Sequence, residues 1–316
     1  MRWKVWLGRV AAALAVGLVV FVFGWVPYFL GGVATVRQYR YPDTENAGLT
    51  PASFQLAYDD VSFQAADGVT LKGWWVPAGE ARGTVVLVHG LNRSRIEMAR
   101  KVPFINREGW NALLFDVRHH GESGGSVSTF DLFEKADVQA AVALARKKSP
   151  GPVVVWGVSL GGATAVLAAA DDPAVAGVVC DSSYRSLRDT VHHHLGLARG
   201  WRWWLAIVPS WPVADEIVYW IGKRGGFDPD AVDVKAAAAR LAGRPTLFVC
   251  NSGDKRMPKD IAFDLQAAAG EKSKVLVVPG NSHGGAYRDG TAAYETAVDE
   301  VLGAAAGTAP RLASSR

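Results

Sequence analysis

The stretch that most constrains the fold of this chain is residues 153–162, Val-Val-Val-Trp-Gly-Val-Ser-Leu-Gly-Gly. Three β-branched residues and a tryptophan are typical of a short buried strand, and the residues from Ala163 onward are typical of a helix. Gly157 and Gly161 flank Ser159 and lack the Cβ atoms that a sharp strand-to-helix turn would crowd. The pattern predicts that Ser159 sits on this turn with its hydroxyl exposed. The same Gly-x-Ser-x-Gly spacing also arises by chance in a chain with 34 glycines.

The composition is that of a folded globular protein. A chain of 316 residues with 49% hydrophobic content can form one large α/β domain or two small ones. The net charge is +4, and no run of Lys and Arg is dense enough to indicate a nucleic-acid surface. We therefore expect neither a disordered chain nor a nucleic-acid partner.

An uncharged apolar run, Val10–Val36, lies near the N-terminus. A membrane span needs about 20 apolar residues, so the run is long enough to cross a bilayer. We expect residues 1–36 to form an uncleaved single-pass anchor whose helix ends near Leu30, because Pro27 and Gly31-Gly32, within the apolar run, disfavour its continuation. A cleaved signal peptide and a buried core helix are the alternatives.

Basic residues before the apolar run set the expected topology. Arg2, Lys4 and Arg9 favour a cytoplasmic N-terminus, although Arg37 and Arg40 on the far side reduce the asymmetry. The rest of the chain would then be extracytoplasmic.

The chain beyond the anchor alternates between strand and helix patterns. Residues 37–51 are predicted to be a linker, 52–306 the main domain and 307–316 a disordered tail. Two antiparallel strands are expected at 55–64 and 69–76, joined by an Asp-Gly turn. Short β-branched runs then follow at 84–88, 112–117, 153–156, 175–180, 246–249 and 275–278, with helices such as 130–147 and 259–269 between them. This alternation predicts an α/β fold, with a mostly parallel eight-stranded sheet and helices on both faces.

One interval, at about 183–240, interrupts the alternation and is predicted to form a helical cap over the carboxyl edge of the sheet. Five tryptophans lie in it, namely Trp201, Trp203, Trp204, Trp211 and Trp220. They form either a small core of the cap itself or an apolar lid that dips toward a membrane.

A serine hydroxyl needs a base to take its proton, and the base needs an orienting partner. Asp254 and His283 each follow a predicted strand, so the candidates occur in the order Ser159, Asp254, His283. That chain order is typical of α/β-hydrolases. Asp181, at the end of the preceding strand, is the alternative acid.

Two backbone N–H groups are candidates for an oxyanion hole. Leu91 follows the strand 84–88 and Leu160 follows Ser159, so both amides would lie at strand ends on the same sheet edge. His89 beside them is predicted to be a structural hydrogen-bonding residue.

The remaining histidines are given structural or surface roles. His119 and His120 are expected to support the turn after the strand 112–117. His192, His193 and His194 are consecutive, so on a helix they face different directions and do not form a metal site. No metal and no cofactor is predicted. Cys180 and Cys250 end buried strands and are expected to be core thiols, although a disulfide is conceivable if those strands are neighbours.

Several stretches together make the chain resemble the α/β-hydrolases, in the membrane-anchored branch of Bem46-like and ABHD-type lipid and acyl hydrolases, with S9-like peptidases as relatives. They are His89-Gly90, residues 116–123, residues 157–161, Asp254 with Pro258, and residues 279–284. The resemblance implies that Ser159 is the nucleophile, His283 the general base, Asp254 its orienting acid, and Leu91 and Leu160 the oxyanion donors. His120 departs from the usual form of its stretch.

We therefore expect a membrane-anchored serine hydrolase that cleaves an ester, thioester or lipid substrate through an acyl-enzyme. An S9-like peptidase or amidase is the nearest alternative, because the same three residues can serve it. A non-catalytic binding protein on the same fold is a further alternative.

Overall fold

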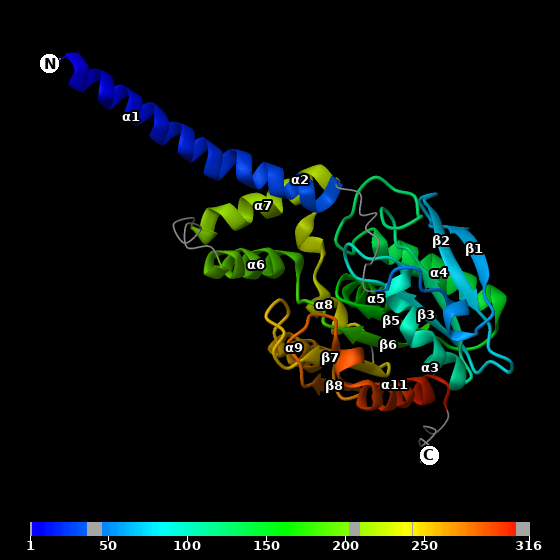
Figure 1. Ribbon diagram of the computed structural model, residues 1–316. Coiled ribbons are helices and arrows are strands. Elements are labelled where there is room, and N and C mark those ends of the chain that lie inside the picture. Colours follow the sequence, from blue (N-terminus) through cyan, green and yellow to red (C-terminus); the bar gives the residue numbers. More distant parts are fainter. Residues whose placement is uncertain (1, 37–45, 202–208, 242, 308–316) are drawn as a thin grey trace. The chain divides into compact units, whose positions relative to one another are not determined.

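The computed structural model describes residues 2–36, 46–201, 209–241 and 243–307 of the chain (Figure 1). The strands are β1 Asp59–Gln64, β2 Thr70–Val76, β3 Thr84–Val88, β4 Asn111–Phe115, β5 Val153–Val158, β6 Val175–Asp181, β7 Thr246–Asn251 and β8 Ser273–Val278. The helices of the same part of the chain are α3 Val102–Arg107, α4 Glu134–Lys148, α5 Leu160–Asp171, α8 Val234–Ala238, α9 Lys259–Ala269, α10 Ala286–Asp289 and α11 Thr291–Ala305.

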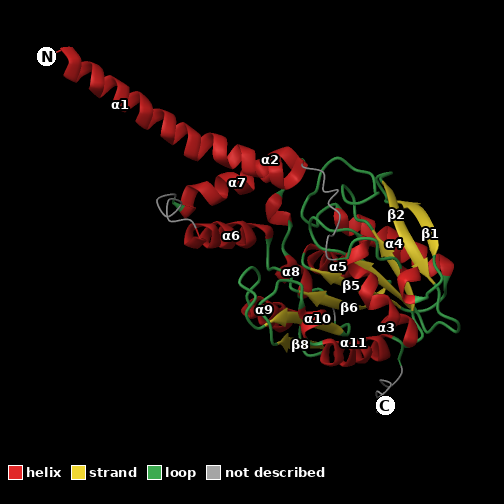
Figure 2. Cartoon of the chain, in the orientation of Figure 1, coloured by secondary structure: helices red, strands yellow, loops and turns green. Residues whose placement is uncertain are grey.

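The eight strands form one sheet in the order β1-β2-β4-β3-β5-β6-β7-β8. β2 is antiparallel to both β1 and β4, and the other neighbouring pairs are parallel. This confirms the predicted α/β fold with a mostly parallel sheet. Helices cover both faces, as Figure 2 shows, and therefore β3, β4 and β5 are buried along their whole length.

Contacts between elements define the two helical layers. α4, α5, α8 and α9 follow one another on one face of the sheet, and α3, α10 and α11 lie on the other. Trp156 of β5 faces the second layer, where its ring stacks on Tyr294 of α11 and meets Phe104 of α3 edge-on. The centre of the sheet is thus packed on both sides, which holds the strand ends rigidly.

The predicted strand at 55–64 is too long at its start. Residues 51–54 form a 3₁₀ turn, and Gln55 ends it with a left-handed backbone (φ 60°), so the strand begins at Asp59. Of the predicted linker and tail, residues 37–45 and 308–316 lie outside the described residues.

The chain divides into two compact units. One comprises residues 1–37 and 187–230 and is called the helical unit below; the other comprises residues 38–186 and 231–316 and is called the sheet unit. The helical unit contains α1 Arg2–Val20, the π-helical turn η1 Phe21–Trp25, α2 Val26–Val36, α6 Leu187–Trp201 and α7 Ser210–Gly225. Trp203 and Trp204 of the predicted cap lie outside the described residues.

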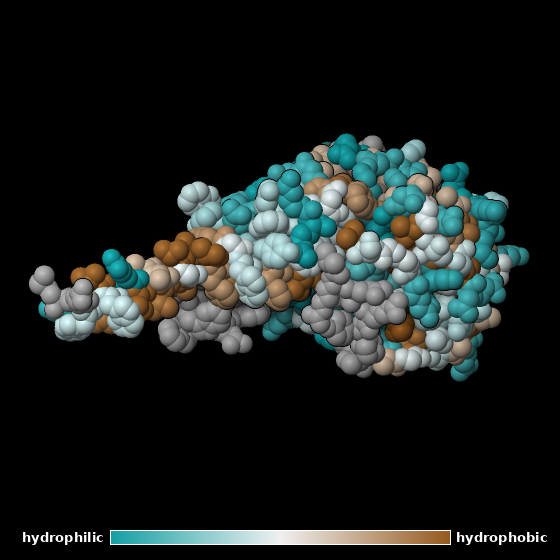
Figure 3. Space-filling view, turned by 90° about the horizontal axis from the view of Figure 1, so that it is seen from above, coloured by the Kyte–Doolittle hydropathy of each residue, from teal (hydrophilic) through white to brown (hydrophobic). Residues whose placement is uncertain are grey.

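The N-terminal apolar run forms a continuous helix, but it does not end near Leu30 as predicted. α2 continues to Val36, because Gly31 and Gly32 allow close packing on α7 instead of ending the helix. Residues Trp3–Thr35 are long and apolar enough to span a membrane, and their most apolar 18-residue window has a mean hydropathy of 2.3 and is little buried. Hydrophobic side chains extend along this helix in Figure 3.

Candidate active site

Ser159 lies on the sharp turn between β5 and α5. Its backbone is strained, with φ 55° and ψ −116°, a conformation that non-glycine residues rarely adopt. A Cβ atom on Gly157 would overlap the backbone of Gly161, and one on Gly161 would overlap the carbonyl oxygens of Val88 and His89. The two glycines therefore permit the turn, as the sequence predicts.

The structure brings Ser159, His283 and Asp254 into one chain of hydrogen bonds. Nε2 of His283 lies 2.8 Å from Oγ of Ser159, and Nδ1 lies 2.8 Å from Oδ2 of Asp254. The Asp254 carboxylate accepts a hydrogen bond from the N–H at Nδ1, so Nε2 carries no proton and accepts the hydrogen bond of the serine hydroxyl. This arrangement can take a proton from Ser159 as that oxygen attacks an electrophile.

Close packing of the loops after β7 and β8 places Asp254 beside His283. A Cβ atom on Gly253 would overlap the side chain of Asn281, and the Gly253 N–H donates a 2.8 Å bond to the carbonyl oxygen of Gly280. A side chain at position 253 would therefore displace the side chain of Asn281. Sequence reasoning did not single out Gly253, although its place directly before Asp254 was a signal for such an approach.

Asp254 is held as a carboxylate. Its Oδ1 accepts hydrogen bonds from the backbone N–H groups of Arg256 (2.8 Å) and Met257 (3.1 Å), while Oδ2 accepts from His283. Burial raises the pKa of Asp254, but the hydrogen bond and charge of His283 and the two N–H donors outweigh burial and lower this pKa below its usual value. The carboxylate therefore stays ionised and can stabilise a protonated His283.

Asp181, the alternative acid, makes other contacts. Its carboxylate accepts hydrogen bonds from the hydroxyls of Tyr294 (3.0 Å) and Ser182 (2.8 Å), and it is fully buried. Burial raises its pKa. Ser182 in turn accepts a 3.3 Å bond from the N–H of Gly284, the residue after His283. Asp181 is thus connected to the loop of His283 through Ser182. The sequence alone did not reveal this connection.

The loop after β3 lies against Ser159. A Cβ atom on Gly90 would be 3.5 Å from the Cβ of Ser159, which places Leu91 next to the turn. Among the described residues, the N–H groups of Leu91 and Leu160 donate to no protein acceptor. Both amides are available to bind an anionic oxygen beside Ser159.

His89 holds this loop to the neighbouring strand. Its Nε2 accepts a 3.1 Å bond from the N–H of Val117, so its proton is on Nδ1, which donates to the carbonyl oxygen of Gly90 (2.8 Å). The ring is fully buried, and burial, with the nearby His120 ring contributing, lowers its pKa to about 3. His89 is a neutral structural residue, which agrees with the role predicted for it.

The other histidines occupy local positions. Nδ1 of His120 lies 2.9 Å from the carbonyl oxygen of Arg118, within the turn after β4. On α6, His192 lies 3.4 Å from Asp215 and Nδ1 of His194 contacts the carbonyl oxygen of Thr190. These contacts are consistent with turn and helix-surface roles.

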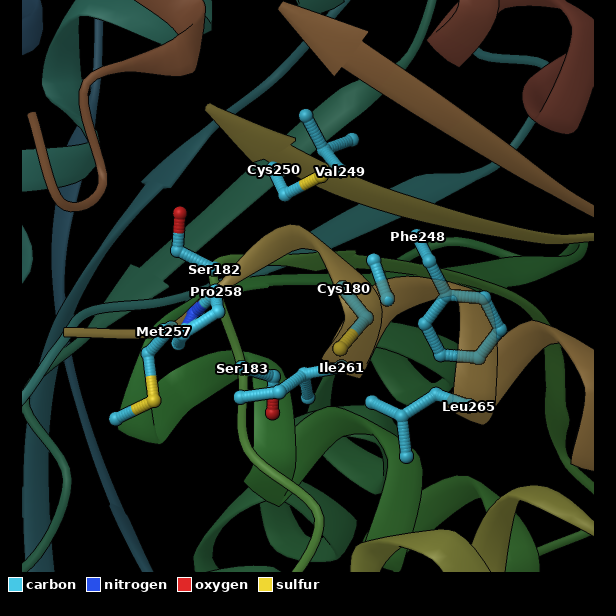
Figure 4. A pocket seen from close by; sticks show the side chains of 11 residues that line it. Cys180, Ser182, Ser183, Phe248, Val249, Cys250, Met257, Pro258, Ile261 and Leu265 are labelled. Atoms are coloured by element: carbon cyan, nitrogen blue, oxygen red, sulfur yellow. The ribbon is translucent and has the colours of Figure 1, made fainter. Parts of the chain in front are cut away.

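A small hollow of about 10 Å³ lies between β6, β7 and α9 (Figure 4). Both cysteines line it, together with apolar residues such as Phe248 and Leu265, and Ser159 does not. Cys180 and Cys250 are both free and buried although their strands are neighbours. The hollow is smaller than a typical ligand pocket and is a gap in the apolar layer rather than a substrate site.

A known protein family matches the part of the chain that carries Ser159. The family model described as "Serine aminopeptidase, S33" matches residues 79–243, just over half of the chain, and covers the turn that carries Ser159. The chain belongs to this family. Its members are α/β-hydrolases, so this protein is a hydrolase enzyme of the α/β fold.

Individual relatives of this S33 family member are distant. It is 25% identical over 298 residues to the uncharacterised protein YfhR of Escherichia coli strain K12, covering 90% of this chain and 93% of YfhR. It is 24% identical over 242 residues to the uncharacterised protein YqkD of Bacillus subtilis strain 168, covering 75% and 77%. The esterase Pf2001 of Pyrococcus furiosus has a similar fold, with a TM-score of 0.67, 23% identity, and coverage of 81% of this chain and 94% of the esterase.

Proposed function

We propose that this hydrolase cleaves carboxylic esters or thioesters through an acyl-enzyme on Ser159. The observation that supports the proposal is the hydrogen-bond chain from Ser159 through His283 to Asp254, with 2.8 Å at both contacts of the imidazole. Strain at Ser159 and two unused N–H groups beside it complete the parts that acyl transfer needs.

The reaction has two halves. Oγ of Ser159 attacks the acyl carbonyl carbon while Nε2 of His283 accepts the hydroxyl proton, and the tetrahedral oxyanion binds the N–H groups of Leu91 and Leu160. The leaving alcohol or thiol takes the proton from His283 as its bond to carbon breaks. Water then attacks the acyl-enzyme, gives a proton to His283, and releases the carboxylic acid when Ser159 recovers that proton. Asp254 stabilises the imidazolium in both halves.

The test is hydrolysis of p-nitrophenyl esters from acetyl to palmitoyl by wild type and Ser159→Ala. Wild type should turn over esters and react with a fluorophosphonate probe, and Ser159→Ala should lose about 10³-fold or more of the rate and all labelling. Ser183→Ala is the control, since Ser183 lies nearby but outside the hydrogen-bond chain. Equal rates in wild type and Ser159→Ala would overturn the proposal.

Peptide or amide cleavage is the second candidate, favoured by the family's description as a serine aminopeptidase. The same three residues can attack an amide, so the discriminating measurement is turnover of aminoacyl p-nitroanilides beside the ester series. A higher kcat/KM on the anilides than on any ester would select the peptidase function. Absence of turnover on both, with no probe labelling, would select a non-catalytic role.

We propose further that the N-terminal helix anchors the protein, with the N-terminus cytoplasmic and the domain at 52–306 extracytoplasmic. The support is the apolar helix Trp3–Thr35 and the basic residues at its start. Protease added to intact cells should then digest the domain. Digestion only after the cells are lysed would show the opposite orientation.

A further inference from the structure

Within the helical unit, α2 packs directly on α7 through two glycines. A Cβ atom on Gly31 would lie 2.7 Å from the Cβ of Trp220, and one on Gly32 would lie 2.7 Å from Cζ of Arg224. The ring of Tyr28 meets Trp220 edge-on and lies under the guanidinium of Arg224, 4.5 Å away. The apolar N-terminal helix and the helix of the insertion are therefore one packed pair.

The length of the N-terminal helix places this contact at a membrane surface. The 33 residues of Trp3–Thr35 form a helix about 50 Å long, whereas a hydrocarbon core of about 30 Å needs only about 20 residues. If the span begins after Arg9, the last charged residue before the apolar run, it ends near Phe29. Trp25 and Tyr28 then lie at the interface, where aromatic residues are enriched. The residues of α2 that pack on α7 begin with Tyr28, and therefore at the same depth in the membrane.

α7 exposes aromatic side chains on the side that faces away from its apolar contacts. Its inner side is buried and apolar, comprising Val213, Ala214, Ile217, Val218 and Ile221. Its outer side exposes Trp211 (75%) and Tyr219 (50%), with Asp215 between them in an ion pair with Arg188 of α6, and its last turn carries Lys223 and Arg224. η1 also contacts α7, so α7 lies beside residues that belong to the predicted span. Exposed aromatic rings next to a membrane helix fit a lipid surface.

We propose that the exposed aromatic side of α7 contacts the bilayer, held beside the span by α2, and that the enzyme takes acyl esters from the bilayer. The second part rests on the proposed esterase function. The insertion that contains α7, residues 187–230, leaves and rejoins the sheet unit next to a β-bridge between Ser186 and Asp233. Ser186 lies five residues after the end of β6 at Asp181. The helix bound to lipid is thus connected at both ends to the sheet edge that carries Ser159.

The first test measures where α7 lies. The full-length protein is reconstituted in phosphatidylcholine vesicles with a fluorophore on Trp211→Cys or, in a second variant, on Tyr219→Cys. Nitroxide-labelled phospholipid should quench both labels several-fold more than a label on Phe263→Cys, an exposed residue of α9 in the sheet unit. Equal quenching at all three positions would overturn the proposed docking.

The second test separates α7 from the anchor. Gly31→Leu forces α2 and α7 apart, whereas Gly24→Leu adds the same side chain to the same helix where nothing lies within 4 Å. Gly31→Leu should reduce quenching at position 219 and raise KM for a long-chain ester in vesicles about tenfold, with the rate on soluble p-nitrophenyl acetate unchanged. Gly24→Leu should match wild type, and identical behaviour of the two variants would overturn the coupling.

The two proposals fail in different ways. Quenching at positions 211 and 219 without Ser159-dependent turnover would overturn the esterase function and leave the docking intact. Turnover without that quenching would overturn the docking and leave the esterase function intact.

Discussion

The backbone N–H of Ser159 donates a 2.7 Å hydrogen bond to the carbonyl oxygen of Asp181. This bond joins the strained turn to the end of β6, and the side chain of Asp181 continues the connection through Ser182 to Gly284. One buried residue thus positions both the serine and the loop of His283. The carboxylate of Asp181 does not contact the imidazole of His283; the carboxylate of Asp254 makes that contact.

Asp254→Asn is expected to reduce kcat/KM for esters by about 10³-fold or more, because an amide neither orients the imidazole correctly nor stabilises its protonated form. Asp181→Asn should cost much less activity, since an amide can still accept from Tyr294. Steady-state kinetics of both variants on p-nitrophenyl acetate compare them. A larger loss in Asp181→Asn would make Asp181 the acid of the reaction.

Ser182→Ala removes the acceptor for the Gly284 N–H and a donor to Asp181. We expect a kcat about three- to tenfold lower with KM unchanged, because His283 would be held less firmly while the substrate contacts stay the same. Ser182→Thr keeps the hydroxyl and should restore most of the rate. No rescue by threonine, with a lower thermal midpoint in both variants, would indicate a packing role only.

Gly161→Ala should destabilise the protein by about 3 kcal/mol or more, because its Cβ would overlap two backbone carbonyl groups that cannot move independently. The matched control is Gly196→Ala on α6, where nothing lies within 4 Å. This control should be neutral or stabilising by up to about 1 kcal/mol. Urea unfolding measures both, and similar midpoints in the two variants would contradict the prediction.

The sequence predicts the sheet well because its strands are short β-branched runs that helices cover on both sides. β3 and α9 have the predicted bounds, and most of the other predicted strands differ by two residues or fewer at either end. Ser159, Asp254 and His283 could be chosen from the sequence because each follows a strand, and parallel strands bring their carboxyl ends to one edge.

Sequence reasoning failed where tertiary packing overrides local preference. Gly31 and Gly32 favour a helix end in isolation, but the packed α7 stabilises the helix through them. The sequence did not indicate that Tyr294 supports the site, because its hydrogen bond to Asp181 joins residues more than a hundred positions apart. Such long-range partners follow from the fold and not from spacing.

Neither cysteine should react with iodoacetamide at pH 8 in the native protein. Burial raises the pKa of Cys180 to about 12 and that of Cys250 to about 11, so almost no thiolate forms, and both side chains are covered. Mass spectrometry should find two modified cysteines in denaturant and none before unfolding. Rapid native labelling of either thiol would contradict the buried positions of both.

Acid should destabilise the protein through His89. Its folded pKa of about 3 lies below the ordinary value of 6.5, so above pH 6.5 both the folded and the unfolded states hold it neutral. As the pH falls from 6.5 toward 3, only the unfolded state gains the proton, and the free energy of unfolding drops, by about 2 kcal/mol at pH 5.

His89→Gln should be less stable at pH 7.5, because it loses the bond from Val117, but should lose less stability between pH 6.5 and 5. His193→Gln, at a partly exposed position of α6, is the control for the loss of a histidine. Urea unfolding at each pH measures the slopes. Equal slopes in wild type and His89→Gln would show that another group causes the acid sensitivity, with buried His120 the next to replace.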